Sequence, residues 1–300
     1  MNIYYHPIYT KGIDPRSTFP KERYDLIRNE LVAKEFANHI NINTPIEAKI
    51  QDIYRAHTNE YVDAFLNSEL TEKQIREIGL KPWTNKIIQR TLLLTGGSLC
   101  ALRDIYNGAA VAANMAGGTH HAFSDRGSGF CIFNDLAICA IKAIEKYAYN
   151  RVLIIDLDVH QGDGTASILK DNDNVFTFSI HCKQNFPFKK EASNTDIEIE
   201  SGADDLIYLN ILKKSLSALD LIESDIIFFQ AGVDTLSTDR YGKLSLTIEG
   251  LNERNKLVFD FAQKRQNPIL ILMGGGYSKP IDNTVTAFRD LFIEASKYSY

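Results

Sequence analysis

A short stretch of this 300-residue chain, VLIIDLDVHQGDGT (152–165), places acidic side chains and an imidazole directly after a run of aliphatic residues. The aliphatic part is typical of a buried strand, and Asp156, Asp158, His160 and Asp163 stand at and beyond its end. Asp158 and His160 are spaced i, i+2, so in an extended segment their side chains point to the same side. A carboxylate and an imidazole that converge in this way suit a zinc ion. The stretch therefore predicts part of a metal site.

Three further segments supply titratable side chains after apolar runs. GGTHHAF contains His120 and His121, VDTLSTD contains Asp234 and Asp239, and GGGYS contains Tyr277. If the preceding runs are parallel strands, these groups share one edge of the sheet, where the ligands of open parallel sheets bind. Several segments that deliver such groups to one edge indicate a site more specifically than any single motif.

The third metal ligand is predicted to be Asp234, because it lies directly at the end of its strand, whereas Asp239 lies further along the loop. Three protein ligands leave one coordination position open for water, which is typical of a catalytic zinc site. A competing interpretation is that Asp158 and Asp163 cap a helix beginning near Gly164. Helix capping explains one carboxylate and not the whole group. Asp239 is left without a role.

The histidine pair and the tyrosine predict acid–base and oxyanion chemistry. Asp156 and Asp163 are expected to accept hydrogen bonds from the far ring nitrogens of the two histidines and so fix their tautomers. Two imidazoles near a metal site suit general acid–base catalysis. The phenol of Tyr277, which follows three glycines, suits a donor to a developing oxyanion. The alternatives are a surface or core histidine pair, an exposed loop tyrosine, and a phosphate loop, although GGGYSKP lacks the following GK[ST].

The elements that position these groups alternate between strand and helix. Continuously apolar runs predict buried strands at 2–5, 151–158, 175–181, 225–232 and 268–276. Helical spacing of apolar residues predicts helices at 134–147, 204–219, 247–262 and 283–295. The alanine-rich run 109–116 fits helix and strand equally well. The alternation predicts an α/β fold with a parallel sheet, and the lack of a linker predicts a single domain over residues 1–300.

Composition and charge exclude several classes of protein. The net charge of −5 gives no basic surface for nucleic acid. No apolar run approaches the roughly 20 residues that span a bilayer, and the first residues do not have the pattern of a signal peptide. The cysteines are not spaced as CxxC, which disfavours a cysteine zinc site and predicts a reducing, cytoplasmic location. They are Cys100, Cys131, Cys139 and Cys182.

Five motifs resemble those of the zinc-dependent histone deacetylase family, and they occur in the same order. They are GGTHHAF, SGFCIFND, DLDVHQGDGT, GVDTLSTD and GGGYS. The resemblance extends from about His57 to the C-terminus. The stretch HCKQNFPFKKEASNTDIEI and the compact length are most similar to class IV-like and bacterial deacetylase homologues. The resemblance implies an arginase/deacetylase fold with a central parallel sheet of about eight strands flanked by helices.

The resemblance also implies two cation sites. One catalytic Zn²⁺ would be held by Asp158, His160 and Asp234. A structural K⁺ would take its ligands from Asp156, Asp158, His160, Ser179 and Ile180. From the ligand types alone, Fe²⁺ or Co²⁺ would also suit the catalytic site.

Catalytic and substrate-binding roles follow from the same resemblance. His120 and His121 take the positions of the tandem catalytic histidines, Asp156 and Asp163 those of their carboxylate partners, and Tyr277 that of the carbonyl-polarising tyrosine. Gly129 and Phe130 match a tunnel wall, and Phe186 is the facing aromatic. The rim aspartate of class I members is missing from the corresponding segment REIGLKPWTNK (76–86).

The expected function is therefore metal-dependent hydrolysis of the amide that joins an acyl group to the lysine side chain. Small acetylated amines such as acetylpolyamines are alternative substrates. A two-metal ureohydrolase shares the fold but needs D-x-H-x-D, and Gly162 stands at the place of the last aspartate. A third alternative is a module that binds acyl-lysine without turnover.

Overall fold

The computed structural model describes residues 1–33 and 39–299 and is built around one sheet of eight parallel strands. The strand order is β2-β1-β3-β8-β7-β4-β5-β6. The strands are β1 Asn2–Tyr4, β2 Asn41–Asn43, β3 Val111–Asn114, β4 Val152–Asp156, β5 Val175–Cys182, β6 Thr195–Ile199, β7 Ile226–Gln230 and β8 Ile269–Leu272. The α/β fold and the parallel sheet are confirmed.

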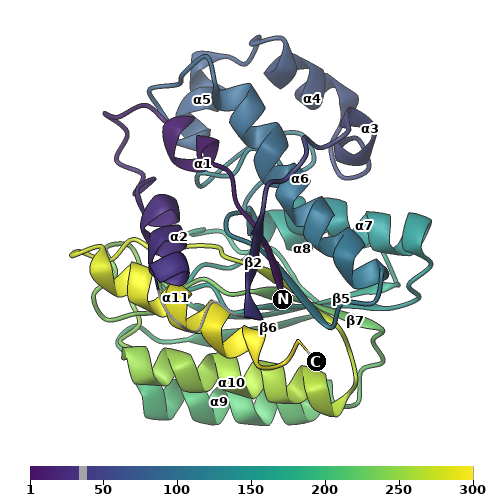
Figure 1. Cartoon of the computed structure of the whole chain (residues 1–300), viewed down its shortest axis with the longest axis vertical. Helices are drawn as coiled ribbons and strands as arrows, with labels where there is room; N and C mark the ends of the chain where they lie inside the picture. Colours follow the sequence, from purple (N-terminus) through teal and green to yellow (C-terminus); the bar gives the residue numbers. More distant parts are fainter. Residues whose placement is uncertain (34–38, 300) are drawn as a thin grey trace.

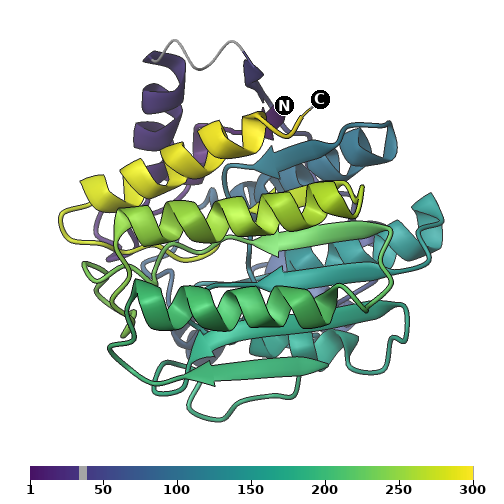
Figure 2. The ribbon, with the colours of Figure 1, turned by 90° about the horizontal axis from the view of Figure 1, so that it is seen from below.

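Helices cover both faces of the sheet (Figures 1 and 2). They are α1 Ile8–Lys11, α2 Arg23–Ala33, α3 Ile50–Ile53, α4 Asn59–Leu66, α5 Glu72–Ile78, α6 Ile87–Tyr106, α7 Asp135–Tyr147, α8 Asp163–Leu169, α9 Asp205–Leu219, α10 Ile248–Lys264 and α11 Asp282–Ser296. On one face, α6 packs against β1, β3 and β8, and α7 and α8 pack against β4 and β5. On the other face, α10 lies between α9 and α11. The shorter helices α1, α3, α4 and α5 gather at the top of Figure 1.

The sequence specifies both the strands and the helix starts locally. All five residues of β4 and of β7 are buried, as expected for aliphatic runs covered on both faces. Helices α7, α9 and α10 begin after Asn134, Asp204 and Thr247, and each of these side chains accepts a hydrogen bond from a backbone N–H of the first turn. No helix in the described part of the chain is long and apolar enough to cross a membrane.

The ends of the central strands lie level with one another. Asp156 is in register with Ser179 on one side and with Gln230 on the other. Gln230 is in register with Leu272, which in turn is in register with Asn114. The segments that follow these strands therefore leave the sheet from one edge, which is where the sequence predicted the chemical groups to meet.

Three details of the sheet differ from the sequence prediction or go beyond it. The ambiguous run 109–116 forms the strand β3, because it lies between β1 and β8 with all four of its strand residues buried. Strands β2 and β6 were not predicted. Both are edge strands of polar sequence, NIN and TDIEI, whose pairing depends on the neighbouring strand.

Arg254 of α10 ties this helix to the functional edge of the sheet. Its side chain is fully buried and donates to the carbonyl oxygens of Gly232 at 2.6 Å, Leu157 at 3.2 Å and Ala231 at 3.3 Å. These carbonyls belong to the segments that directly follow β4 and β7. The guanidinium therefore fixes the backbone from which the predicted metal ligands project.

We expect Arg254→Met to lower the free energy of unfolding by about 2–4 kcal/mol, because it leaves buried carbonyl oxygens without a donor. Urea denaturation followed by circular dichroism measures this change. The control is Lys256→Met on the same helix, since Lys256 is exposed and its ion pair with Asp260 lies at the surface. Equal stability of the two variants would contradict the role of Arg254.

Candidate active site

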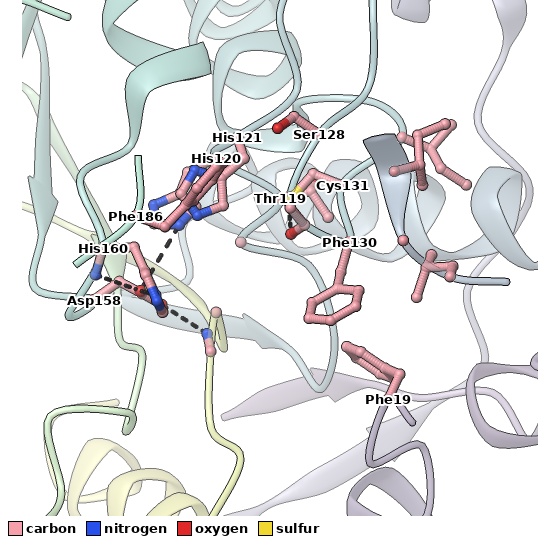
Figure 3. Close-up of a pocket in the computed structure, with 18 of the residues that line it drawn as sticks. Phe19, Thr119, His120, His121, Ser128, Phe130, Cys131, Asp158, His160 and Phe186 are labelled. Atoms are coloured by element: carbon pink, nitrogen blue, oxygen red, sulfur yellow. Dashed lines mark hydrogen bonds and ion pairs between the residues drawn. The ribbon is translucent and has the colours of Figure 1, made fainter. Parts of the chain in front are cut away.

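Asp158, His160 and Asp234 converge at the carboxyl ends of β4 and β7. One ligand atom from each residue lies within 4.8 Å of the other two. The Nδ1 atom of His160 is 3.0 Å from an oxygen of Asp158 (Figure 3). The same nitrogen is 3.1 Å from an oxygen of Asp234. The two carboxylates are almost completely buried. Two carboxylates and one imidazole are a donor set that suits Zn²⁺.

The backbone holds these three side chains through the loops of three strands. Asp158 accepts from the N–H of Gly275 at 2.7 Å, and Asp234 accepts from the N–H of Val159 at 2.9 Å. A Cβ atom at Gly275 would lie 1.9 Å from an oxygen of Asp234, and one at Gly232 would lie 2.2 Å from an oxygen of Asp158. The close approach of these loops therefore requires glycine at both positions.

The electrostatics of this group favour a bound cation. Burial and the neighbouring Asp158 carboxylate raise the pKa of Asp234 to about 7. Burial alone would lower the pKa of His160, but the hydrogen bonds and charges of the two carboxylates outweigh it and raise this pKa to about 10. The pocket thus concentrates negative charge away from water, and a divalent cation held by these three residues would relieve this crowding. The residues present fit a metal ion.

The two adjacent histidines each contact a buried carboxylate. The Nδ1 atom of His120 is 2.7 Å from Asp156, and the Nδ1 atom of His121 is 2.6 Å from Asp163. The ring centroids of the histidines are 4.1 Å apart, and the His121 ring is 5.7 Å from that of His160. The structure therefore brings both pairs to the metal-binding group, as the sequence predicted.

The two histidines differ in charge. For His120, burial lowers the pKa, but the charges of Asp156 and Asp158 outweigh it and raise the pKa to about 9. For His121, burial and the neighbouring His120 lower the pKa to about 4. The neighbouring carboxylates thus favour the protonated form of His120, whereas burial favours the neutral form of His121.

The backbone of the histidine pair is fixed by Asn134 and Asp135, for which the sequence suggested no role. The Asn134 amide donates to the carbonyl oxygens of His120 and Ala122, at 3.3 and 3.0 Å, while its oxygen caps α7. The Asp135 carboxylate accepts from the N–H of Thr119 at 2.8 Å. The sequence feature that could have indicated this role is the pair of adjacent polar residues at the start of a buried helix.

Tyr277 lines the same cavity, and its position depends on Asp239. The Asp239 carboxylate accepts from the N–H of Tyr277 at 2.6 Å and from those of Tyr241 and Gly242 at 2.9 Å each. The rings of Tyr277 and Tyr241 make an edge contact with centroids 5.0 Å apart. Burial raises the pKa of the Tyr277 phenol well above its ordinary value, so the phenol stays protonated and able to donate. Asp239, left unassigned above, joins the loops after β7 and β8.

The cavity above the metal-binding group has a volume of about 660 Å³. Gly129, Phe130 and Phe186 all line it. The ring of Phe186 packs on His121 at 5.0 Å, and the ring of Phe130 packs toward Tyr277 at 5.8 Å, so the two phenylalanines contact different walls (Figure 3). Gly129 has a φ of +53°, and a Cβ atom there would lie 2.6 Å from the His121 ring.

Residues far away in the sequence complete the cavity and were not predicted. Phe19 and Arg23 come from the N-terminal part, and Glu77 comes from α5. Arg23 donates to the carbonyl oxygens of Gly274 at 3.1 Å and Gly276 at 3.0 Å, which precede Tyr277. No sequence motif marks these residues, and tertiary packing, such as that of α2 beside α11 for Arg23, brings them to the cavity.

The potassium site remains a prediction. The register of β4 and β5 places Asp156 beside Ser179, with Ile180 next along β5. The Ser179 hydroxyl lies 2.9 Å from Nδ1 of the buried His181.

Comparisons with known proteins agree with the fold and show the family of the chain. The model of the "Histone deacetylase domain" family matches residues 17–290. An uncharacterized protein of Picosynechococcus sp. is 41% identical over 285 residues, which cover 94% of each chain. Histone deacetylase 2 of Arabidopsis thaliana is 30% identical over 89% of this chain and 71% of its own length. Histone deacetylase 1 of Homo sapiens is also 30% identical, over 85% of this chain and 56% of its own length.

The parallel sheet and the edge that carries these side chains are those of the arginase/deacetylase superfamily. Within it, the chain belongs to the histone deacetylase family. This membership supports a hydrolase that removes acetyl groups.

The metal-binding group predicts about one zinc ion per chain, and Asp234→Ala is expected to lose it because one of three ligands is removed. Atomic absorption on dialysed protein measures the zinc content. Asp239→Asn is the matched control, since Asp239 lies on the same loop and outside the group of three. Two ions per chain, or full zinc content in Asp234→Ala, would refute this assignment.

Proposed function

We propose that the protein hydrolyses the amide between an acyl group and the side-chain amine of lysine, in a metal-dependent reaction. The observation that carries this proposal is the contact of the His121 imidazole, itself bound to a buried carboxylate, with a three-residue group suited to a metal ion in one cavity. Asp158, His160 and Asp234 would hold the ion. When bound, a Zn²⁺ ion supplies Lewis acidity toward the acyl carbonyl and the attacking water.

His121 is the proposed general base. Its Nδ1–H donates to Asp163, so the lone pair of Nε2 is free to take a proton from the attacking water. The same imidazole, once protonated, gives the proton to the leaving lysine amine. Asp163 is suited to stabilise the transient imidazolium, since the two groups are 2.6 Å apart in a buried site.

His120 and Tyr277 are proposed to stabilise negative charge that develops on the acyl oxygen. His120 is held as a cation by Asp156 and contributes electrostatically. Tyr277 would donate its phenol hydrogen to the developing oxyanion. Asp239 holds the N–H of this tyrosine and Arg23 holds the carbonyl oxygens of the glycines before it, so both fix the backbone that aims its ring.

The cavity walls suit the lysine side chain. Phe130 and Phe186 offer apolar surface to the methylene groups and exclude water from the reacting carbonyl. Gly129 lets the Phe130 segment approach His121 closely. The same cavity would accept a small acetylated amine, which remains the alternative substrate class.

The geometry disfavours the two-metal ureohydrolase alternative. A second metal would need a carboxylate at position 162, where the chain has glycine. A Cβ atom at Gly162 would lie 2.5 Å from an oxygen of Asp156 and 3.1 Å from His120 Nδ1. The contact between His120 and Asp156 therefore occupies the space that a carboxylate side chain at position 162 would need.

His121→Ala is expected to lower kcat by at least about 100-fold while the zinc content stays unchanged, because it removes the general base and no metal ligand. A fluorogenic acetyl-lysine substrate, assayed with and without a chelator, measures the rate. Metal analysis of the same preparation separates lost chemistry from lost zinc. Near-normal turnover by the variant would refute the role of His121.

Tyr277→Phe is expected to reduce kcat by about 10²–10³-fold, because it removes one donor to the oxyanion and keeps the ring.

Asp239→Ala is expected to reduce kcat by about 10–100-fold with the phenol still present, because Tyr277 loses the contact that aims it. Partial rescue by Asp239→Asn, which keeps one acceptor oxygen, distinguishes positioning from a general loss of folding. Wild-type kcat in Asp239→Ala would show that the contact with Tyr277 does not matter.

A further inference from the structure

Two short loops form one side of the cavity mouth. The first is 183–190, KQNFPFKK, and the second is 240–243, RYGK. Gln184, Phe186, Phe188, Tyr241 and Lys243 of these loops all line the cavity. Phe188 is 89% exposed, so an apolar ring stands at the entrance facing solvent. We call these two segments the mouth loops.

The mouth loops are strongly basic. They contain five cationic side chains and no aspartate or glutamate, in a chain whose net charge is −5. The five are Lys183, Lys189, Lys190, Arg240 and Lys243. Because the chain as a whole is acidic, this cluster of positive side chains produces a local positive potential that the net charge does not reveal.

Nearby acids offset this charge only in part. Glu200 lies 3.5 Å from Lys183, and the charges of Glu198 and Asp196 act on Lys190. Glu77, which also lines the cavity, lies 3.9 Å from Lys73 on its own helix. Asp239 precedes the second loop, but its carboxylate faces three backbone N–H groups and not the solvent. Lys189 and Arg240 are exposed at the entrance, next in sequence to the lining residues Phe188 and Tyr241.

The mouth loops are also fixed to each other and to the metal-binding group. Asn185 donates to the Tyr241 carbonyl oxygen at 2.6 Å and accepts from the N–H of Lys243 at 3.0 Å. Its amide nitrogen also lies 3.3 Å from Nε2 of His160. The ammonium groups of Lys190 and Lys243 donate to carbonyl oxygens of the first loop. The positive charge is therefore held in place beside the reaction site.

We propose that the mouth loops select acyl-lysine residues flanked by acidic side chains and disfavour polycationic amines. The proposal rests on the proposed function and names its substrate class. Aspartate or glutamate beside the modified lysine meets Lys189, Arg240 and Lys243, while the exposed Phe188 ring contacts the peptide between them. A polyamine brings further positive charge to the same place and is repelled.

The test compares three peptides that share one central acetyl-lysine and have flanks of aspartate and glutamate, of serine and alanine, or of lysine and arginine. N-acetylputrescine is the fourth substrate. With the zinc-loaded protein we expect kcat/KM to be about tenfold higher for the acidic than for the basic peptide at low ionic strength. Because the charges are exposed, the ratio should narrow at high ionic strength. We expect N-acetylputrescine to be hydrolysed more slowly than the serine and alanine peptide.

The variant Lys189→Glu/Arg240→Glu should remove or reverse the preference and leave kcat/KM for the serine and alanine peptide within about twofold. Neither side chain contacts the reacting groups. The matched control is Lys214→Glu, an exposed lysine on α9 outside the cavity lining, which should keep the wild-type ratio.

Equal kcat/KM for the acidic and basic peptides, or an unchanged ratio in the double variant, would overturn the inference. Hydrolysis of none of the peptides would instead refute the proposed function. In that case the dissociation constants of the same fluorescent-labelled peptides, measured by anisotropy, decide the inference: tighter binding of the acidic peptide supports it, and equal binding overturns it.

Discussion

The structure depends on the burial of negative charge at the carboxyl ends of two central strands. Asp156, Asp158 and Asp234 are each at most 3% exposed, and carboxylates without water are costly unless each finds a donor or a cation. The chain meets this requirement with His120, His160 and backbone N–H groups from neighbouring loops. A divalent ion held by Asp158, His160 and Asp234 would complete the charge balance. The buried carboxylates that are most costly for the fold thus include two members of the group that is proposed to hold a metal ion.

This requirement shapes the surrounding backbone. The donors can reach the carboxylates only if the loops after β4, β7 and β8 approach within a distance that excludes a side chain, which explains the glycines at 232 and 275. Arg254 holds the segments after β4 and β7 through their carbonyl oxygens. The backbone that carries the carboxylates is therefore fixed by α10 as well as by hydrogen bonds from the neighbouring loops.

The sequence predicted those parts of the site whose residues directly follow a recognisable strand. Asp158, His160, Asp234 and the histidine pair follow apolar runs, and parallel strands bring such positions together whatever the loops contain. The edge strands β2 and β6 escaped prediction because short polar segments become strands only beside a partner. Arg23 and Glu77 escaped because no motif marks them and tertiary packing alone brings them to the cavity. Phe186 was placed correctly at the cavity, yet its ring packs on His121, a contact that spacing does not reveal.

The basic residues at the cavity mouth are of two kinds, which differ in the hydrogen bonds that their side chains make. Lys190 and Lys243 use their ammonium groups to hold carbonyl oxygens of the first mouth loop, which also carries Asn185 beside His160. Changing either lysine would move this loop and disturb the metal ligand together with the entrance. Lys189 and Arg240 project from the same loops into solvent and hold no backbone group, so they contribute charge without supporting the geometry. Substrate preference can therefore change at these two positions while the chemistry beneath them stays the same.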